Sequence, residues 1–132
     1  MAGIAPGIRA ALLNDGPVSG TVGGSRIYFK TLPQVPTYPA ITLELISGNP
    51  DNTLDSLPAL VWSRVRVNAW GKTYQAAMTL ATQVETALNG KTITVSGLVI
   101  RSVVADGMHD EYEPAVEAHY ICQDYRIWHK PA

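Results

Sequence analysis

One continuous stretch of this sequence carries two regular hydrophobic patterns of different period. From Leu60 to Trp70 apolar and polar side chains alternate, which is typical of a half-buried strand. One face receives Val61, Ser63, Val65, Val67 and Ala69, and the other receives Trp62, Arg64, Arg66, Asn68 and Trp70. From Thr73 to Leu88 apolar residues recur every three or four positions, which predicts a helix that Thr73 caps and Gly90 ends. The sequence therefore predicts a strand that runs almost directly into a helix.

The residues before this unit predict one short helix and one further long strand. Apolar residues at three- and four-residue steps predict a helix from Gly3 to Leu13. Three glycines between Gly20 and Ser25 predict a turn, which leads into the short apolar piece at residues 26–29. Residues 40–46 alternate like a strand, and residues 47–59 are rich in Gly, Asn, Asp, Ser and Pro. We expect this second segment to be a long exposed loop between two strands.

The residues after the helix predict three more strands. Residues 92–95 and 98–105 flank the dipeptide Ser96-Gly97, which is typical of a hairpin. Residues 108–114 are acidic and are expected to form a connection, and residues 116–128 are expected to form the last strand. Hairpin-length connections favour an antiparallel sheet. The fold class expected is α+β, with a mainly antiparallel sheet, two helices packed on one face, and one domain over residues 1–132.

Composition narrows the classes of partner and compartment. The 132 residues carry ten basic and eleven acidic side chains, so a formal charge of −1 gives no global attraction to nucleic acid or to a membrane surface. No stretch approaches the ~20 apolar residues that span a bilayer, and the N-terminus lacks the pattern of a signal peptide. A single cysteine, Cys122, excludes an internal disulfide. We expect a soluble protein that is made in a reducing cytoplasm.

The candidate chemical motifs do not combine into a catalytic or metal site. The glycines at residues 20–25 lack the Gly-Lys-Ser/Thr ending of a phosphate-binding loop. Five residues that are close in sequence could be ligands of a metal ion; they are His109, Asp110, Glu111, Glu113 and His119. Their spacing matches no known metal-binding motif, and an exposed acidic turn explains them better. Cys122 lies inside a predicted strand, where a buried thiol is the ordinary role. We therefore predict a protein that is not an enzyme and that has no cofactor.

The face with Trp62, Arg64, Arg66 and Trp70 has three interpretations. Aromatic residues between arginines can bind single-stranded nucleic acid by stacking. The same residues can form a solvent-exposed face on which arginine stems cover the tryptophan rings. Tryptophan and arginine are also the residue types most enriched at binding hot spots, which favours a protein interface. The near-neutral charge of the chain disfavours the first interpretation.

Four passages, taken in order, resemble the tail-completion or tail-to-head joining proteins of long-tailed bacteriophages. The passages are residues 22–28 with 32–33 and 39–42, residues 65–70 with 74–77 and 87–90, residues 110–114, and residues 120–128. Each is a short sheet or turn pattern, and the likeness lies in their order and spacing along almost the whole chain. The resemblance implies a structural virion subunit that completes the tail at its head-proximal end and joins it to the head connector. It also implies a ring of six copies on the tail tube protein, through which DNA passes without sequence readout.

Three sets of residues are the candidates for assembly contacts. They are the strand face Trp62, Arg64, Arg66 and Trp70, the loop residues Asp51, Asn52 and Asp55, and the acidic residues Asp110, Glu111, Tyr112 and Glu113. The protein would occupy the host cytoplasm during assembly and then the head–tail junction of the virion. Two alternatives stay open at this point. One is a small nucleic-acid- or ligand-binding domain that uses the Trp62 and Arg64 face, and the other is a neck or head-completion protein.

Overall fold

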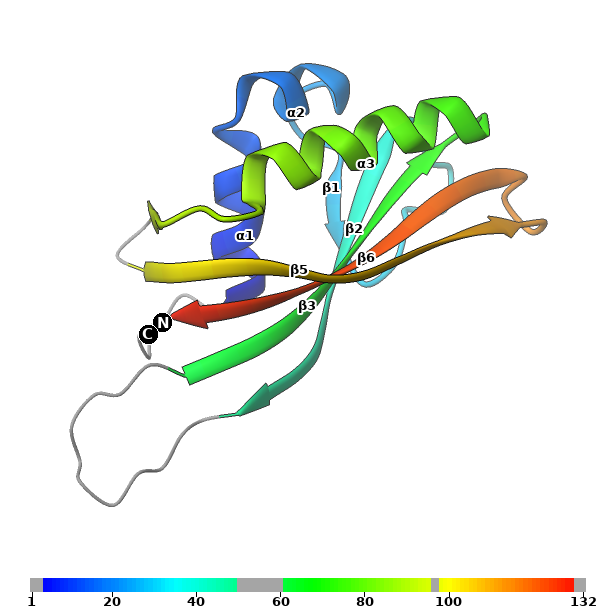
Figure 1. The fold of residues 1–132 in the computed structure, drawn as a ribbon. Coiled ribbons are helices and arrows are strands. Elements are labelled where there is room, and N and C mark those ends of the chain that lie inside the picture. The colour runs from blue at the N-terminus through cyan, green and yellow to red at the C-terminus, as the bar shows by residue number, and fades with distance from the viewer. Residues whose placement is uncertain (1–3, 50–60, 96–97, 130–132) are drawn as a thin grey trace, which may run out of the picture.

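The computed structural model describes residues 4–49, 61–95 and 98–129 and contains three helices and six strands within these ranges (Figure 1). In chain order they are α1 (Ile4–Leu13), α2 (Gly16–Thr21), β1 (Ile27–Phe29), β2 (Ala40–Asn49), β3 (Val61–Gly71), α3 (Tyr74–Leu88), β4 (Ile93–Val95), β5 (Leu98–Glu113) and β6 (Ala118–His129). The predicted strand and helix between residues 60 and 88 correspond to β3 and α3, each within one residue. None of the helices described is long and apolar enough to cross a bilayer.

The six strands form one sheet in the order β1-β2-β3-β6-β5-β4. Only β1 and β2 run parallel, and every other neighbouring pair is antiparallel. α1 and α3 pack on the same face of the sheet, and α2 packs beside α3 (Figure 1). The predicted fold class, α+β with a mainly antiparallel sheet and helices on one face, is confirmed.

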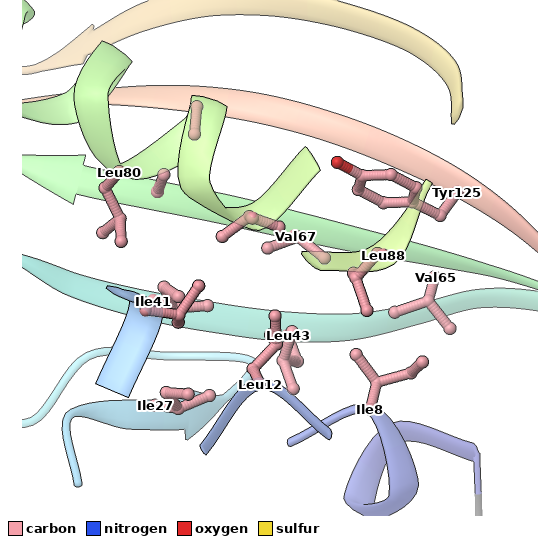
Figure 2. Close-up of a cluster of buried hydrophobic side chains, with 14 of the residues drawn as sticks. Ile8, Leu12, Ile27, Ile41, Leu43, Val65, Val67, Leu80, Leu88 and Tyr125 are labelled. Carbon is pink, nitrogen blue, oxygen red and sulfur yellow. The ribbon is translucent and has the colours of Figure 1, made fainter. Parts of the chain in front are cut away.

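The core lies between α3, α1 and the helix-covered face of the sheet (Figure 2). Alternate residues of β3 are fully buried there, as the period-two pattern predicts, and they include Val65 and Val67. Ala77 and Ala81 bring the backbone of α3 close to the sheet because an alanine side chain is only a methyl group. Thr73 caps α3 by accepting a hydrogen bond from Ala76 N, as predicted from the sequence.

Gly71 fixes how closely α3 follows β3. A Cβ atom at this position would lie 2.5 Å from the backbone nitrogen of Ala77, a contact that no side-chain rotation relieves. Gly71→Ala should therefore destabilise the fold by about 1–3 kcal/mol, as overpacking does in other cores. The melting temperature should fall by roughly 3–10 °C, measured by circular dichroism. Gly20→Ala is the control, because a Cβ added there has no atom within 4 Å other than those of its chain neighbours and its own helix backbone. Equal losses in the two variants would refute the close-packing explanation.

One helix was not predicted, and one predicted connection is wrong. Residues 16–21 form the helix α2, because Asp15 accepts a hydrogen bond from Val18 N and the side chain of Val18 is buried. The turn predicted at residues 20–25 is present at residues 22–25, directly after this helix. The predicted acidic connection at residues 108–114 is mostly strand, because β5 continues to Glu113 and pairs with β6 along that stretch. Its exposed, charged side chains suggested a loop, but they belong to a hairpin that extends past the helices. The predicted loop at residues 47–59 begins later than expected, since residues 47–49 belong to β2; residues 50–60 and the turn at 96–97 lie outside the described residues.

Candidate assembly surface

The sheet has one face that none of the described helices covers, and we call it the open face. The register places Trp62 opposite Trp128, Arg64 opposite Arg126, and Arg66 opposite Asp124, with Trp70 opposite Tyr120, all on this face. The neighbours Ser63, Val65, Val67 and Ala69 point to the core and are buried. The structure therefore brings the four predicted residues of β3 together on one surface, beside a matching row of β6.

Ion pairs connect the arginines of the open face to two aspartates. Arg66 Nε donates to Asp124 Oδ1 at 2.8 Å, and Arg64 Nη1 lies 3.7 Å from Asp124 Oδ2. Arg64 also forms an ion pair with Asp106, to which Arg126 Nη2 is 3.4 Å distant. The hydrogen bond to Asp124 raises the pKa of Arg66. Each of the three arginines therefore has a carboxylate partner within the same subunit.

The aromatic rings of the open face also have partners within the same subunit. The rings of Trp70 and Tyr120 stack with centroids 4.3 Å apart, and Trp70 Nε1 donates to Thr42 Oγ1 at 3.0 Å. The ring centroids of Trp62 and Trp128 lie 6.4 Å apart, and the two ring planes are inclined by 51°. The guanidinium carbon of Arg126 lies 5.3 Å from the Trp62 ring centroid. Such contacts hold large side chains in fixed positions on the surface. The open face is thus a prearranged polar and aromatic surface.

This arrangement weakens the nucleic-acid interpretation of Trp62 and Arg64. Binding of a single strand would need free aromatic faces and unneutralised arginines. Here the rings contact one another and the arginines contact aspartates.

Cys122, on the open face of the sheet, is buried, and burial raises the pKa of its thiol to about 11. The thiol is therefore protonated at neutral pH, as expected for the buried cysteine predicted from the sequence.

The acidic candidates occupy the distal part of β5, where alternation separates them. Asp110 and Tyr112 lie opposite Ile121 and His119, on the side of the helices. His109, Glu111 and Glu113 fall on the side of the open face, and His109 Nε2 is 3.7 Å from Glu111 Oε2. Within the described ranges, no three His, Cys, Asp or Glu side chains lie close enough together to hold a metal ion. Asp51, Asn52 and Asp55 lie outside the described residues.

Sequence reasoning missed an apolar hollow between α3 and the distal part of β5. Its lining residues are Tyr74, Met78, Met108, His109, Asp110 and Ile121. Three large apolar side chains near it are about half exposed, namely Tyr74 at 44%, Met108 at 53% and Tyr112 at 50%. Their apolar character was visible in the sequence, but the hollow exists only because β5 extends beyond the helix layer. This edge of the sheet is a second candidate for assembly contacts.

Comparison with known proteins gives one family and two similar folds. The model of the family described as tail completion protein gp17 matches residues 6–130. No curated protein shows significant similarity to the sequence. A chain from the virion of a native gene transfer agent (GTA) particle has a TM-score of 0.71 at 14% identity, covering 97% of this chain and 95% of that one. A second solved chain, which carries no functional description, has a TM-score of 0.60 at 11% identity over 95% and 94% of the two chains; both likenesses show a shared fold.

Proposed function

Because the chain belongs to the tail completion protein gp17 family, we propose that it completes a phage-type tail at its head-proximal end and joins it to the head connector. The family makes it a structural tail protein, and the observation that carries the proposal is the match over residues 6–130, almost the whole chain. The fold shared with a chain of a gene transfer agent virion supports a place in the assembled particle. The subunit is made in the host cytoplasm and then becomes part of the head–tail junction.

The form that suits this role is a closed ring of six copies on the end of the tail tube. A ring uses a heterologous interface, in which one patch of a subunit meets a different patch of its neighbour. The packing of α1 and α3 on one face of the sheet favours a ring with its helices outside and its open face toward the lumen. The face with Trp62, Arg64, Arg66 and Trp70 then lines the passage for DNA. Its ion-paired arginines suit DNA that moves through without being held.

Removal of the chain tests the role directly. Without it, cells should accumulate filled heads and separate tails whose head-proximal ends are irregular, seen by negative-stain electron microscopy. Supply of the wild-type chain in trans should restore joined particles. Immunogold labelling of the chain should mark one end of isolated tails.

Two outcomes of this experiment contradict the proposal. Label on isolated heads but not on tails would identify the alternative, a neck or head-completion protein. Normal joined particles in the absence of the chain would exclude a role at the junction altogether.

A further inference from the structure

The sheet ends on each side in a short strand, and each short strand leaves part of its long neighbour unpaired. β1 pairs with residues 41–43 of β2, so in the described part of the chain residues 44–49 are paired on the β3 side only, with a register shift at Ile46. β4 pairs with residues 98–100 of β5. The loop after α3 covers the next part of that edge, because Gly90 N donates to Val103 O and Ala105 N donates to Asn89 Oδ1. Within the described residues, positions 108–113 therefore pair with β6 alone, and positions 106–107 lie in a register shift.

The backbone of each unpaired stretch directs hydrogen-bonding groups outward. Alternate residues of a strand direct their N–H and C=O to opposite neighbours. Ile41 N and Leu43 O bond to β1 and its flanks, so Leu45 directs its groups to the same side, beyond the end of β1. On β5, Ala105 N points away from β6, and the register places Met108 two positions farther along β6. Met108, Asp110 and Tyr112 therefore share that outward direction, which makes both stretches open edges in the strict sense.

The two open edges have matching direction and side chains. Each contains one register shift, at Ile46 in β2 and at residues 106–107 in β5. β2 and β5 run in opposite directions because three antiparallel pairs separate them. A rotated copy therefore presents its β2 antiparallel to β5. With Leu45 opposite Asp110, the Leu45 side chain falls diagonally between Met108 and Tyr112, on the helix-covered face. All three side chains are about half exposed in the single chain, and the apolar hollow beside α3 lies next to them.

The positions of the two edges also fit a closed ring. Asp110 shares a cross-strand row with Ile41, four residues before Leu45, so one copy is shifted by about 13 Å along the strands relative to the next. Each copy adds β2, β3, β6 and β5 to the wall, which is roughly 19 Å of sheet. These two lengths correspond to strands tilted by about 35°, within the range of closed β-barrels. The shift therefore gives the strand tilt of a closed ring.

We propose that neighbouring copies of this chain join by pairing residues 45–49 of one copy with residues 106–110 of the next, with Leu45 opposite Asp110, which makes one continuous sheet around the ring. This deepens the proposed function and rests on its ring. Beyond Asp110 the neighbouring strand reaches β1, where Phe29 pairs with Leu43 and Lys30 N bonds to Leu43 O, so residues 111–113 and the hairpin tip leave the sheet at that point. The acidic residues of β5 hinder indiscriminate edge pairing, so free subunits stay apart until a tail end gathers them.

Disulfide trapping tests the register. Opposed residues in a hydrogen-bonded antiparallel pair have Cα atoms about 5.5 Å apart, a distance that a disulfide spans. Particles assembled with Leu45→Cys/Asp110→Cys should give, after mild oxidation and non-reducing electrophoresis, a ladder of covalent oligomers that ends at the ring. Leu45→Cys or Asp110→Cys alone should stay monomeric, and particles assembled from both single variants should give dimers. The native Cys122 is buried and should not contribute.

Electron microscopy of the same particles separates the two proposals. Rings at the tail end with no covalent ladder would overturn the edge pairing and leave the tail-completion role intact. Joined particles that contain no ring would overturn both the ring and the edge pairing. Covalent dimers in a single-cysteine variant would mean that the same position of two copies meets, which likewise overturns the pairing.

Discussion

Asp110→Pro should reduce the yield of joined particles more than tenfold while the subunit remains folded. Proline removes the outward N–H in the middle of the open β5 edge and places its ring where the neighbouring strand would approach. The bonds to β6 are unaffected, because Asp110 directs its backbone groups away from β6. Each lost interface hydrogen bond costs about 1 kcal/mol, and the steric block adds to this, so affinity at every interface should fall roughly 10- to 100-fold. Particle titre measures the effect, and circular dichroism confirms the fold.

Matched alanine variants separate the backbone from the side chain. Asp110→Ala keeps the N–H and should lose far less titre than Asp110→Pro. Leu45→Pro should act like Asp110→Pro, since it blocks the other open edge, and Leu45→Ala should again have the smaller effect. Because each subunit needs two good edges, either proline variant co-expressed with the wild-type chain should inhibit ring closure by the wild type. Equal titres for the proline and alanine members of each pair would refute backbone pairing.

The unit from β3 to α3 was predictable because each of the two elements contacts the core on one side only. One face of β3 and one stripe of α3 contact the core, so the sequence periods of 2 and 3.6 appear directly in the residues. The same periodicity predicts that Trp62, Arg64, Arg66 and Trp70 share a face. The partners of these residues were not predictable, because Asp124 and Asp106 are 58 and 42 residues away from Arg66 and Arg64 in the chain.

The distal part of β5 was not predictable for the opposite reason. Residues 106–113 extend past the helix layer and are largely exposed on both faces, so no hydrophobic alternation marks them as a strand. α2 was missed because its glycines, serine and proline favour a turn, and only its cap at Asp15 and the burial of Val18 stabilise it. The open edges follow from where β1 and β4 end within the sheet. That is a property of the assembled sheet, to which no local pattern corresponds.

The ion pairs of the open face also bear on how DNA would move through the proposed ring. Arginine binds phosphate strongly when it is free, and a ring multiplies every such contact by its number of subunits. In this subunit Asp124 and Asp106 offset two of the three positive charges of Arg64, Arg66 and Arg126. The two aspartates therefore bind the arginines in the way that phosphate groups of DNA would bind free arginines. Removal of the two carboxylates should raise the net charge of these five side chains from +1 (three arginines and two aspartates) to +3.

Asp106→Asn/Asp124→Asn should accordingly give the chain a measurable affinity for double-stranded DNA that the wild type lacks near 0.15 M salt. If the three released arginines contact phosphates, the logarithm of the binding constant should fall with the logarithm of the salt concentration with a slope of roughly −2 to −3. Fluorescence anisotropy with a labelled duplex measures both quantities. Glu85→Gln/Glu117→Gln is the control, because it changes the net charge equally without touching an arginine partner on the open face. Similar DNA binding by the control would show that net charge alone is responsible. No binding by the aspartate variant at low salt would mean that these carboxylates are not what prevents the arginines from binding phosphate.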